Sequence, residues 1–369
     1  MFYFLHHFHE PDGWRLVLNL FRYVTFRAAA GAATGFLVAV FIMPWLIRRL
    51  KAMNVLEKAE NPDSEELAKL QAAKDKTPTM GGVGILAGVL GATVLWCDLT
   101  NVYVQLAAGT GLLMGIIGFA DDWMKLKGLG RHGMTARRKL ALQLVAVAGL
   151  VGVLVLTARG PFEATRLALP FVKPDIFAPR LGALYVLFGT LLIVGSSNAV
   201  NLTDGLDGLA SGCAVVAALA YAVLAYVAGH FEIASYLNLP FIRGAEEMTV
   251  ICAALGGATL GFLWFNSHPA EIFMGDTGSL AIGGILGMAA CVAKQELLLA
   301  LVGGVFVIEA VSVILQVGSF KLTGRRVFKI APLHHHFQFH GWSEDKVVVR
   351  FWIMAVIFAL MSVATLKVR

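Results

Sequence analysis

A polar stretch at residues 198–210, NAVNLTDGLDGLA, interrupts an apolar, glycine-rich part of the chain. Its polar side chains recur at every third position, as Asn198, Asn201, Asp204 and Asp207. On a helix, neighbouring members of such a series share a face. Polar groups in an apolar setting are costly unless they meet one another, water, a cation or a polar substrate. The stretch is therefore predicted to line a site, and a polar helix start with Asp204 as N-cap is the alternative.

Two adjacent carboxylates, Asp121 and Asp122, follow the apolar run 111–120. Adjacent carboxylates repel each other unless a cation or a proton lies between them, and such oxygen ligands suit a Mg²⁺ ion that holds substrate phosphates. Lys125 shares a helical face with Asp121 and can neutralise a second phosphate. The pattern indicates a Mg²⁺–phosphate site, against the alternative of a solvated acid pair at a membrane interface.

A third acidic motif, NSHPAEIFMGDTGS, occupies residues 266–279. Asp276 lies between glycines and resembles a loop carboxylate presented to a ligand, and the hydroxyl residues after it can cap the next helix. Phe273 can stack on a base and Asn266 can read its edge. Alternatively, Phe273 is an aromatic anchor at the membrane interface.

Three consecutive histidines, His334, His335 and His336, lie in a long basic loop. Consecutive side chains cannot all face one way, so a metal site with three ligands from this triplet is not expected. We expect one or two of them to bind phosphate or relay protons instead.

A lysine-containing segment, KDKTPTMGG, ends the first long polar loop at residues 74–82. Pro78 breaks the helical register, and the glycines after it allow a turn that exposes N–H groups to an anion. The lysine pair just ahead of Pro78, Lys74 and Lys76, can reach phosphate. A basic flank of a membrane helix is the equally simple interpretation.

The rest of the chain indicates how these motifs are positioned. Hydrophobic residues make up 58% of the sequence and charged residues 15%, which is too apolar for a soluble domain. The apolar segments have about the 20 residues that a helix needs to cross a bilayer, and strand-like alternation is absent. We therefore predict a single all-α polytopic domain, residues 1–369, embedded in a lipid bilayer. About ten spans are expected, at 24–47, 80–97, 102–120, 138–157, 182–198, 206–228, 248–265, 278–293, 297–320 and 347–366.

The distribution of basic residues predicts the orientation. The segments on one side of the membrane would be 48–79, 121–137, 199–205, 266–277 and 321–346. Counted through Lys139, that side carries eighteen Lys and Arg, and the other side carries ten. By the positive-inside rule the first side is cytoplasmic, and both termini are periplasmic. Every polar motif then falls on the cytoplasmic face. The net charge of +6 is explained by basic helix flanks and needs no nucleic-acid partner.

The motifs together favour one kind of chemistry. Acid pairs that suit Mg²⁺, lysines for phosphate and a base-stacking aromatic indicate phosphoryl transfer between a soluble nucleotide substrate and a lipid acceptor. The sequence contains no P-loop, and no GxGxxG precedes a helix, which argues against ATP hydrolysis or hydride transfer. The four cysteines occur singly, without CxxC spacing, so a disulfide framework or a zinc site is not expected.

The motif set closely resembles that of a known family, the muramoyl-pentapeptide branch of the polyprenyl-phosphate N-acetylhexosamine-1-phosphate transferase superfamily. The resemblance covers nearly the whole chain in order. Its motifs are TPTMGG at 77–82, DDWMK at 121–125, NAVNLTDGLDGLA at 198–210, NSHPAEIFMGDTGS at 266–279 and PLHHHF at 332–337. It implies a Mg²⁺-dependent reaction in which UDP-N-acetylmuramoyl-pentapeptide and undecaprenyl phosphate give lipid I and UMP. It also implies a homodimer in the bacterial cytoplasmic (inner) membrane.

The resemblance also implies roles for single residues. The implied catalytic residues are Asp121, Asp122, Asp276 and His334, with Asp276 as the principal Mg²⁺ ligand and Asp121 and Asp122 as further metal ligands. The implied substrate-binding residues are Lys125, Asp207, Asn266 and Phe273 at the uridine, and Lys74, Asn201, Asp204, His335 and His336 along the pyrophosphate and sugar, with Asn198 beside them. Lys76 stands where the family usually has Gly, so the loop lysine is either Lys74 or Lys76.

Two mechanisms and several rival functions stay open on the sequence. Asp121 or Asp122 can deprotonate the lipid phosphate for direct attack, or one of them can form a covalent phosphosugar intermediate first. We favour direct attack, because a phosphomonoester with a second pKa near about 6 is already nucleophilic. The rivals are a sibling enzyme that uses UDP-N-acetylglucosamine, a membrane prenyltransferase and an ion-coupled carrier.

Overall fold

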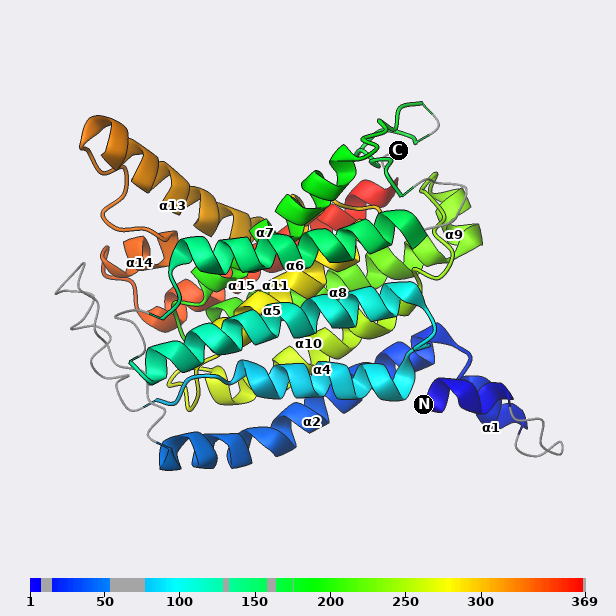
Figure 1. Ribbon diagram of the computed structural model, residues 1–369, viewed down its shortest axis with the longest axis horizontal. Coiled ribbons are helices and arrows are strands. Elements are labelled where there is room, and N and C mark those ends of the chain that lie inside the picture. Colours follow the sequence, from blue (N-terminus) through cyan, green and yellow to red (C-terminus); the bar gives the residue numbers. More distant parts are fainter. Residues whose placement is uncertain (8–14, 54–76, 129–132, 158–163, 175, 368–369) are drawn as a thin grey trace.

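Long apolar helices run side by side through most of the protein (Figure 1). The computed structural model describes residues 1–7, 15–53, 77–128, 133–157, 164–174 and 176–367, and no strand occurs among them. The long helices are α2 (Val24–Ala52), α4 (Gly82–Trp96), α5 (Val102–Leu126), α6 (Ala136–Thr157), α7 (Leu184–Thr203), α8 (Leu209–Gly229), α10 (Glu247–Asn266), α11 (Gly275–Val292), α13 (Gly304–Thr323) and α15 (Glu344–Ala364). The short helices are η1 (Phe2–His7), α1 (Arg15–Leu20), α9 (Phe231–Tyr236), α12 (Leu299–Val302), α14 (Leu333–Gln338) and η3 (Thr365–Lys367).

Nine helices of the described chain are long and apolar enough to cross a membrane. They are α2, α5, α6, α7, α8, α10, α11, α13 and α15. The remaining expected span, 80–97, corresponds to α4, which has 15 residues. At 1.5 Å per residue it reaches about 22 Å, short of the roughly 30 Å of hydrocarbon. The predicted all-α architecture of membrane-length helices is confirmed for the described residues, and the count of ten is not.

Helices α10 and α11 form the centre of the bundle. Helix α10 packs mainly against α2 and α8, and α11 packs mainly against α5 and α7. Every residue from Asp276 to Val292 of α11 is buried. Small residues allow this close packing: a Cβ on Gly283 would lie 2.5 Å from Cα of Ser197 on α7. The long apolar helices therefore pack through faces that carry small residues, and their larger side chains lie on the outside of the bundle.

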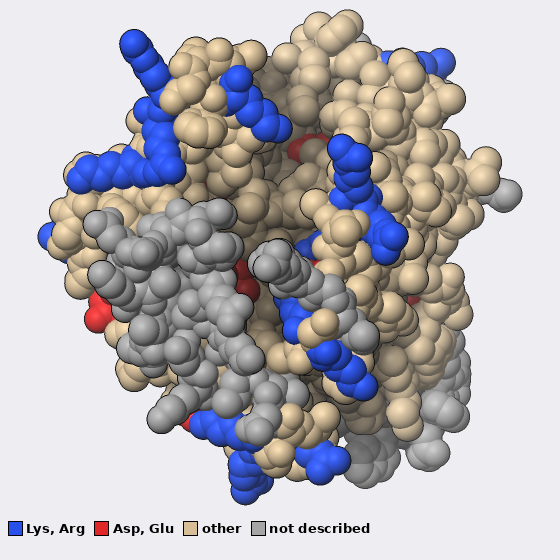
Figure 2. Space-filling view, turned by 60° about the vertical axis from the view of Figure 1, so that its left-hand side comes forward, with Lys and Arg blue, Asp and Glu red and all other residues tan. Residues whose placement is uncertain are grey.

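The predicted motifs lie at one end of the bundle. Helices α5, α7 and α10 end there, and α6, α8 and α11 begin there, because successive helices in each of these pairs run in opposite directions. In Figure 1 this end is on the left, and the labels of both chain termini are on the right. Figure 2 shows the same end as a hollowed face, with Lys and Arg around its rim and acidic atoms deeper inside.

Three of the predicted helix boundaries differ from those in the structure. Helix α5 continues through Leu126, beyond the expected end at residue 120, and the shared helical face predicted for Asp121 and Lys125 is confirmed by their contact at 2.8 Å. Helix α11 begins at Gly275, so Asp276 lies in its first turn and not in a loop. The expected span 297–320 is divided into α12 and α13 at Gly303.

Candidate active site

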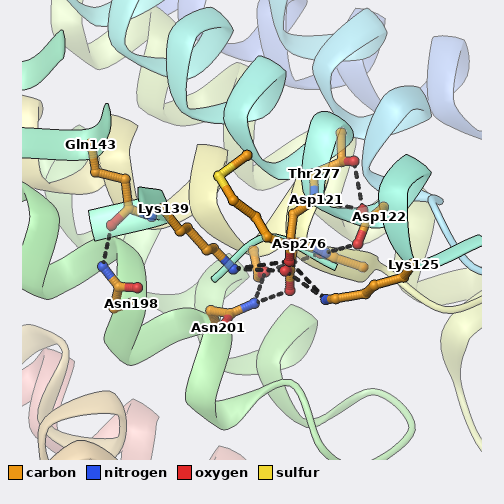
Figure 3. A network of polar contacts seen from close by, with 12 residues as sticks. Asp121, Asp122, Lys125, Lys139, Gln143, Asn198, Asn201, Asp276 and Thr277 are labelled. Atoms are coloured by element: carbon orange, nitrogen blue, oxygen red, sulfur yellow. Dashed lines mark hydrogen bonds and ion pairs between the residues drawn. The ribbon is translucent and has the colours of Figure 1, made fainter. Parts of the chain in front are cut away.

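Asp276 is the centre of a polar network that joins four helices (Figure 3). One carboxylate oxygen, Oδ2, lies 2.6 Å from Nζ of Lys139 on α6 and 2.8 Å from Nζ of Lys125 on α5. The other oxygen accepts a hydrogen bond from the Asn201 amide on α7 at 2.6 Å. The position of Asp276 in the first turn of α11 also suits a negative charge, because the helix dipole is positive there.

Asp121 shares both lysines with Asp276. Its Oδ2 lies 2.8 Å from the Lys125 ammonium and 3.4 Å from the Lys139 ammonium. Its Oδ1 accepts the backbone N–H of Met134 at 2.7 Å, from the segment that leads into α6. Two carboxylates from different helices therefore face the same two cations.

Asp122 has a different environment from its neighbour. Both of its oxygens accept hydrogen bonds at the start of α11, from the backbone N–H groups of Asp276 and Thr277 at 3.0 Å and from the Thr277 hydroxyl at 2.7 Å. Helix α11 is thus capped by a side chain from α5, and the expectation that its own hydroxyl residues provide the cap is wrong. A Cβ on Gly118 of α5 would collide with the carbonyl oxygen of Asp276, so glycine permits this approach.

The polar stretch of residues 198–210 supplies contacts in several directions. Helix α7 ends at Thr203, so Asn198 and Asn201 lie on the helix, and Asp204 and Asp207 lie in the following turn. Asn198 donates a hydrogen bond to the Gln143 side chain of α6 at 2.8 Å. The turn breaks the helical face that the spacing predicts, so the four side chains do not form one stripe.

Asp207 lies in a second polar cluster, near the start of α15. Its Oδ2 lies 3.0 Å from Nδ1 of His268 and accepts the backbone N–H of Ala270 at 3.1 Å. Its backbone N–H donates to Glu344 at 2.9 Å.

Asn266 lies close by and is buried. The Asn266 amide oxygen accepts from Gly208 and Ser211, and its NH₂ group donates to Ile272. Asn266 therefore joins α10 to the start of α8.

The TPTMGG segment packs against the backbone beside Phe273. The N–H groups of Gly81 and Gly82 donate to the carbonyl oxygens of Phe273 and Met274 at 2.8 and 2.9 Å, and the Phe273 N–H donates to Pro78 at 2.8 Å. These two glycine N–H groups are occupied, so the expectation that they face an anion is wrong. Phe273 itself is half-buried.

The three histidines do not all face one way, as expected for consecutive residues: the ring centroids of His334 and His335 lie 4.2 Å apart, whereas the His336 ring packs against His340. The backbone N–H of His334 donates to Glu309 at 3.1 Å, and Nδ1 of His335 lies 2.9 Å from the Gln338 side chain. Nδ1 of His336 accepts the Lys329 N–H at 3.2 Å. Partial burial, together with the neighbouring His340 and Lys329, lowers the pKa of His336, which agrees with this accepting role.

The donor set around Asp276 fits a divalent cation of the hard type. Asp121 and Asp276 present carboxylate oxygens toward one point, where the Lys125 and Lys139 ammonium groups now supply the positive charge. Mg²⁺ prefers oxygen ligands of this kind. Both oxygens of Asp122 are engaged by α11, so its role as a third ligand stays a prediction. A second group, Asp207, His268 and Glu344, places its ligand atoms within 4.8 Å of one another.

Two residues of the network were not singled out by the sequence. Lys139 follows Arg137 and Arg138, and this local pattern indicates only a further basic residue at a membrane boundary. Gln143 lies one turn further along the same face of α6 and is fully buried. The pairing of α6 with α5 and α7 is what brings both into the site. Lys74 and Lys76 lie outside the described residues.

The fold and the site together define a class, that of polytopic membrane proteins with a polar site suited to a phosphate group. The bundle has nine membrane-length helices among its described residues. At one end it holds two carboxylates, Asp121 and Asp276, in direct contact with two ammonium groups, and a third carboxylate, Asp122, bonded to the backbone of Asp276. If all five are ionised, the cluster keeps one net negative charge, which suits a divalent cation and a phosphate-bearing ligand.

Comparison with known proteins identifies the family. Residues 104–294 match the family model described as glycosyl transferase family 4. The chain is 50% identical to the phospho-N-acetylmuramoyl-pentapeptide-transferase of Desulforapulum autotrophicum, and the match covers 100% of both proteins. It is 46% identical to the same enzyme of Maridesulfovibrio salexigens, over 99% of this chain and 100% of the relative. It is 50% identical to that of Desulfatibacillum aliphaticivorans, over 96% of each. The chain belongs to the phospho-N-acetylmuramoyl-pentapeptide-transferase family.

Proposed function

We propose that the protein transfers phospho-N-acetylmuramoyl-pentapeptide from UDP-N-acetylmuramoyl-pentapeptide to undecaprenyl phosphate, giving lipid I and UMP. Family membership at 46–50% identity over nearly the whole chain supports this reaction. The structural observation that carries the proposal is the convergence of Lys125, Lys139 and Asn201 on Asp276. This arrangement offers both cations for phosphate oxygens and carboxylates for a metal.

The chain's own side chains supply most of the chemistry in this proposal. The Lys125 and Lys139 ammonium groups are already placed beside carboxylates, so they can move onto phosphate oxygens without a large rearrangement. Asp121 and Asp276 would hold Mg²⁺, which when bound stabilises the negative charge that develops on the departing UMP. Asn201 keeps Asp276 in place through its hydrogen bond at 2.6 Å.

Direct attack by the lipid phosphate is the route that we propose. A covalent route needs a carboxylate oxygen that is free to reach the phosphorus atom. Both oxygens of Asp122 are bonded to α11, and both oxygens of Asp121 are bonded to Met134 or the lysines. Neither carboxylate is placed as a free nucleophile. The phosphomonoester of the acceptor needs little help to attack, since its second pKa lies near about 6.

We further propose that the site faces the cytoplasm in the bacterial inner membrane, with both termini on the periplasmic side. The excess of Lys and Arg on the side of the motifs supports this orientation. A reporter fused to the C-terminus distinguishes the two orientations, because it would be active only in the compartment that the terminus reaches. A homodimer is also proposed, and the mass of the detergent-solubilised protein measured by light scattering tests it.

The experiment that tests the reaction is release of UMP by the detergent-purified full chain. The protein receives UDP-N-acetylmuramoyl-pentapeptide, undecaprenyl phosphate and Mg²⁺, with UDP-N-acetylglucosamine as the parallel donor and EDTA as the metal control. We expect UMP only from the muramoyl donor, and none with EDTA. Release only from the N-acetylglucosamine donor would overturn the proposed donor, and undiminished release with EDTA would overturn the proposed use of Mg²⁺.

A further inference from the structure

Glu309 is a buried acid that the proposed reaction leaves without a role. It lies in the second turn of α13, in the apolar run GVFVIEAVSV, and its exposed fraction is 0%. A carboxylate inside an apolar membrane-length helix is costly unless a polar partner compensates for it. Among the residues that the structure describes, the partner of its side chain is His334 of α14.

Glu309 contacts His334 through both of its oxygens. Oε1 accepts the backbone N–H of His334 at 3.1 Å, and Oε2 lies 3.3 Å from the ring nitrogen Nδ1. The Oε2–Nδ1 approach is at ion-pair distance and is not a hydrogen bond: within the described residues, Oε2 of Glu309 and both ring nitrogens of His334 have no hydrogen-bond partner. The His334 side chain is 1% exposed. Among the described residues, this carboxylate is the acidic group within ion-pair distance of the imidazole.

The other ring nitrogen of His334 points at the turn between α7 and α8. A Cβ built on Gly205 would collide with Nε2 of His334, so the ring occupies the space that a side chain at position 205 would fill. This turn follows directly from Asn201, which bonds Asp276. Nε2 thus lies at the edge of the site, buried and without a hydrogen-bond partner among the described residues.

We propose that Glu309 is a positioning residue that fixes the proton of His334 on Nδ1 and turns Nε2 toward the Asp204–Gly205 turn. A carboxylate beside one imidazole nitrogen keeps a proton on that nitrogen and leaves the other nitrogen for a ligand. Nε2 then has no proton and can only accept a hydrogen bond, so its ligand is a hydroxyl group on the sugar of the phosphosugar. This inference rests on the proposed function and adds a residue to its site.

The Glu309→Gln variant tests the proposal sharply. The glutamine oxygen can still accept the His334 backbone N–H, but its NH₂ group would then face Nδ1 as a donor. The His334 proton should move to Nε2. We expect kcat for UMP release to fall by on the order of a hundredfold, as for removal of other orienting carboxylates, with a much smaller change in KM. Glu309→Asp should restore part of the rate.

The readouts separate positioning from a structural role. Nitrogen-15 NMR of histidine-labelled protein reports the protonated nitrogen, with the His334 signal identified by its loss in His334→Asn. The matched control is Ser312→Ala, which removes a buried hydroxyl that bonds the Glu309 backbone oxygen at 2.7 Å and leaves its carboxylate intact. The control should keep the wild-type rate and spectrum.

The outcomes distinguish the two proposals. A moved proton in Glu309→Gln together with the loss of kcat supports the positioning role. An unmoved proton, or a Glu309→Gln rate equal to that of the wild type, overturns it. If the wild-type protein releases no UMP from the muramoyl donor, the proposed function fails. The NMR comparison still shows in that case whether Glu309 sets the proton of His334.

Discussion

Lys139 places its ammonium nitrogen 2.6 Å from Oδ2 of Asp276, although the two residues are 137 positions apart in the chain. The same nitrogen lies 3.4 Å from Asp121. Its side chain is 14% exposed, so one cation from α6 holds the acids of α5 and α11 together in a largely buried position. This contact makes Lys139 as central to the site as Lys125, which belongs to the DDWMK motif.

Removal of the Lys139 charge should therefore impair turnover. We expect Lys139→Gln to lower kcat/KM for UMP release by about tenfold to a hundredfold, because a hydrogen bond to a charged group is worth about 1.5–3 kcal/mol. The matched control is Arg138→Gln, since Arg138 precedes it, carries the same charge and is exposed. Steady-state assays of both variants check the prediction. Equal rates for the two variants would show that Lys139 is only a basic helix flank.

Asp276 should be the residue whose loss changes the response to Mg²⁺. In Asp276→Asn the amide cannot carry the charge that Lys125, Lys139 and a cation share, so we expect no measurable turnover at Mg²⁺ concentrations that saturate the wild type. The measurement is UMP release over a Mg²⁺ titration. Glu271→Gln, an exposed acid five positions earlier, is the control and should behave like the wild type. Near-normal activity of Asp276→Asn with an ordinary Mg²⁺ response would exclude this role.

The sequence predicts the acidic motifs and the class of fold for one shared reason. In a chain with 58% hydrophobic residues, a cluster of carboxylates and amides is conspicuous, and so is the apolar run on either side of it. This contrast marks Asn201 and Asp276, and the structure brings them into contact at 2.6 Å. Helix boundaries were less accurate, because Asp121 and Lys125 extend α5 through an ion pair that hydropathy does not register.

The remaining features depend on contacts between distant segments. Lys139 has the same local pattern as Arg137 and Arg138, and only the packing of α6 against α5 selects it. Asp122 is chemically identical to Asp121 in the sequence, and only the approach of α11 turns it into a cap. Glu309 interrupts an apolar run, but its partner lies 25 positions away in α14. Such pairings are properties of tertiary structure and not of local spacing.

Loss of Asp122 should lower the stability of the fold, because its carboxylate caps α11. Asp122→Ala leaves two backbone N–H groups and one hydroxyl of α11 without their acceptor, and each unsatisfied buried donor costs roughly 1–3 kcal/mol. We expect a clear drop in the thermal unfolding midpoint of the detergent-solubilised protein, along with the loss of activity. Asp122→Asn keeps one acceptor oxygen, so its unfolding midpoint should lie between those of the wild type and Asp122→Ala. An unfolding midpoint of Asp122→Ala equal to that of the wild type would contradict the capping role.

The far end of the bundle offers a stability test that should leave the chemistry intact. Arg27 of α2 and Glu247 of α10 form a two-pronged ion pair with nitrogen–oxygen distances of 2.8 and 2.5 Å, and their side chains are 2% and 6% exposed. The Arg27 guanidinium also donates to the Trp96 carbonyl oxygen at 3.0 Å. Both residues lie in the first turns of their helices, at the end of the bundle opposite Asp276.

Breaking this pair should weaken the fold without changing the rate per folded molecule. Arg27→Met leaves a buried, uncompensated carboxylate, and loss of one partner of a buried ion pair costs roughly 3–5 kcal/mol. The double variant Arg27→Met/Glu247→Gln removes both charges and should unfold at a higher temperature than the single variant. Thermal unfolding combined with UMP release, normalised to the folded fraction, checks both statements. If Arg27→Met lowered the normalised rate at moderate temperature, the two ends of the bundle would be coupled, and the role of this pair would extend beyond stability.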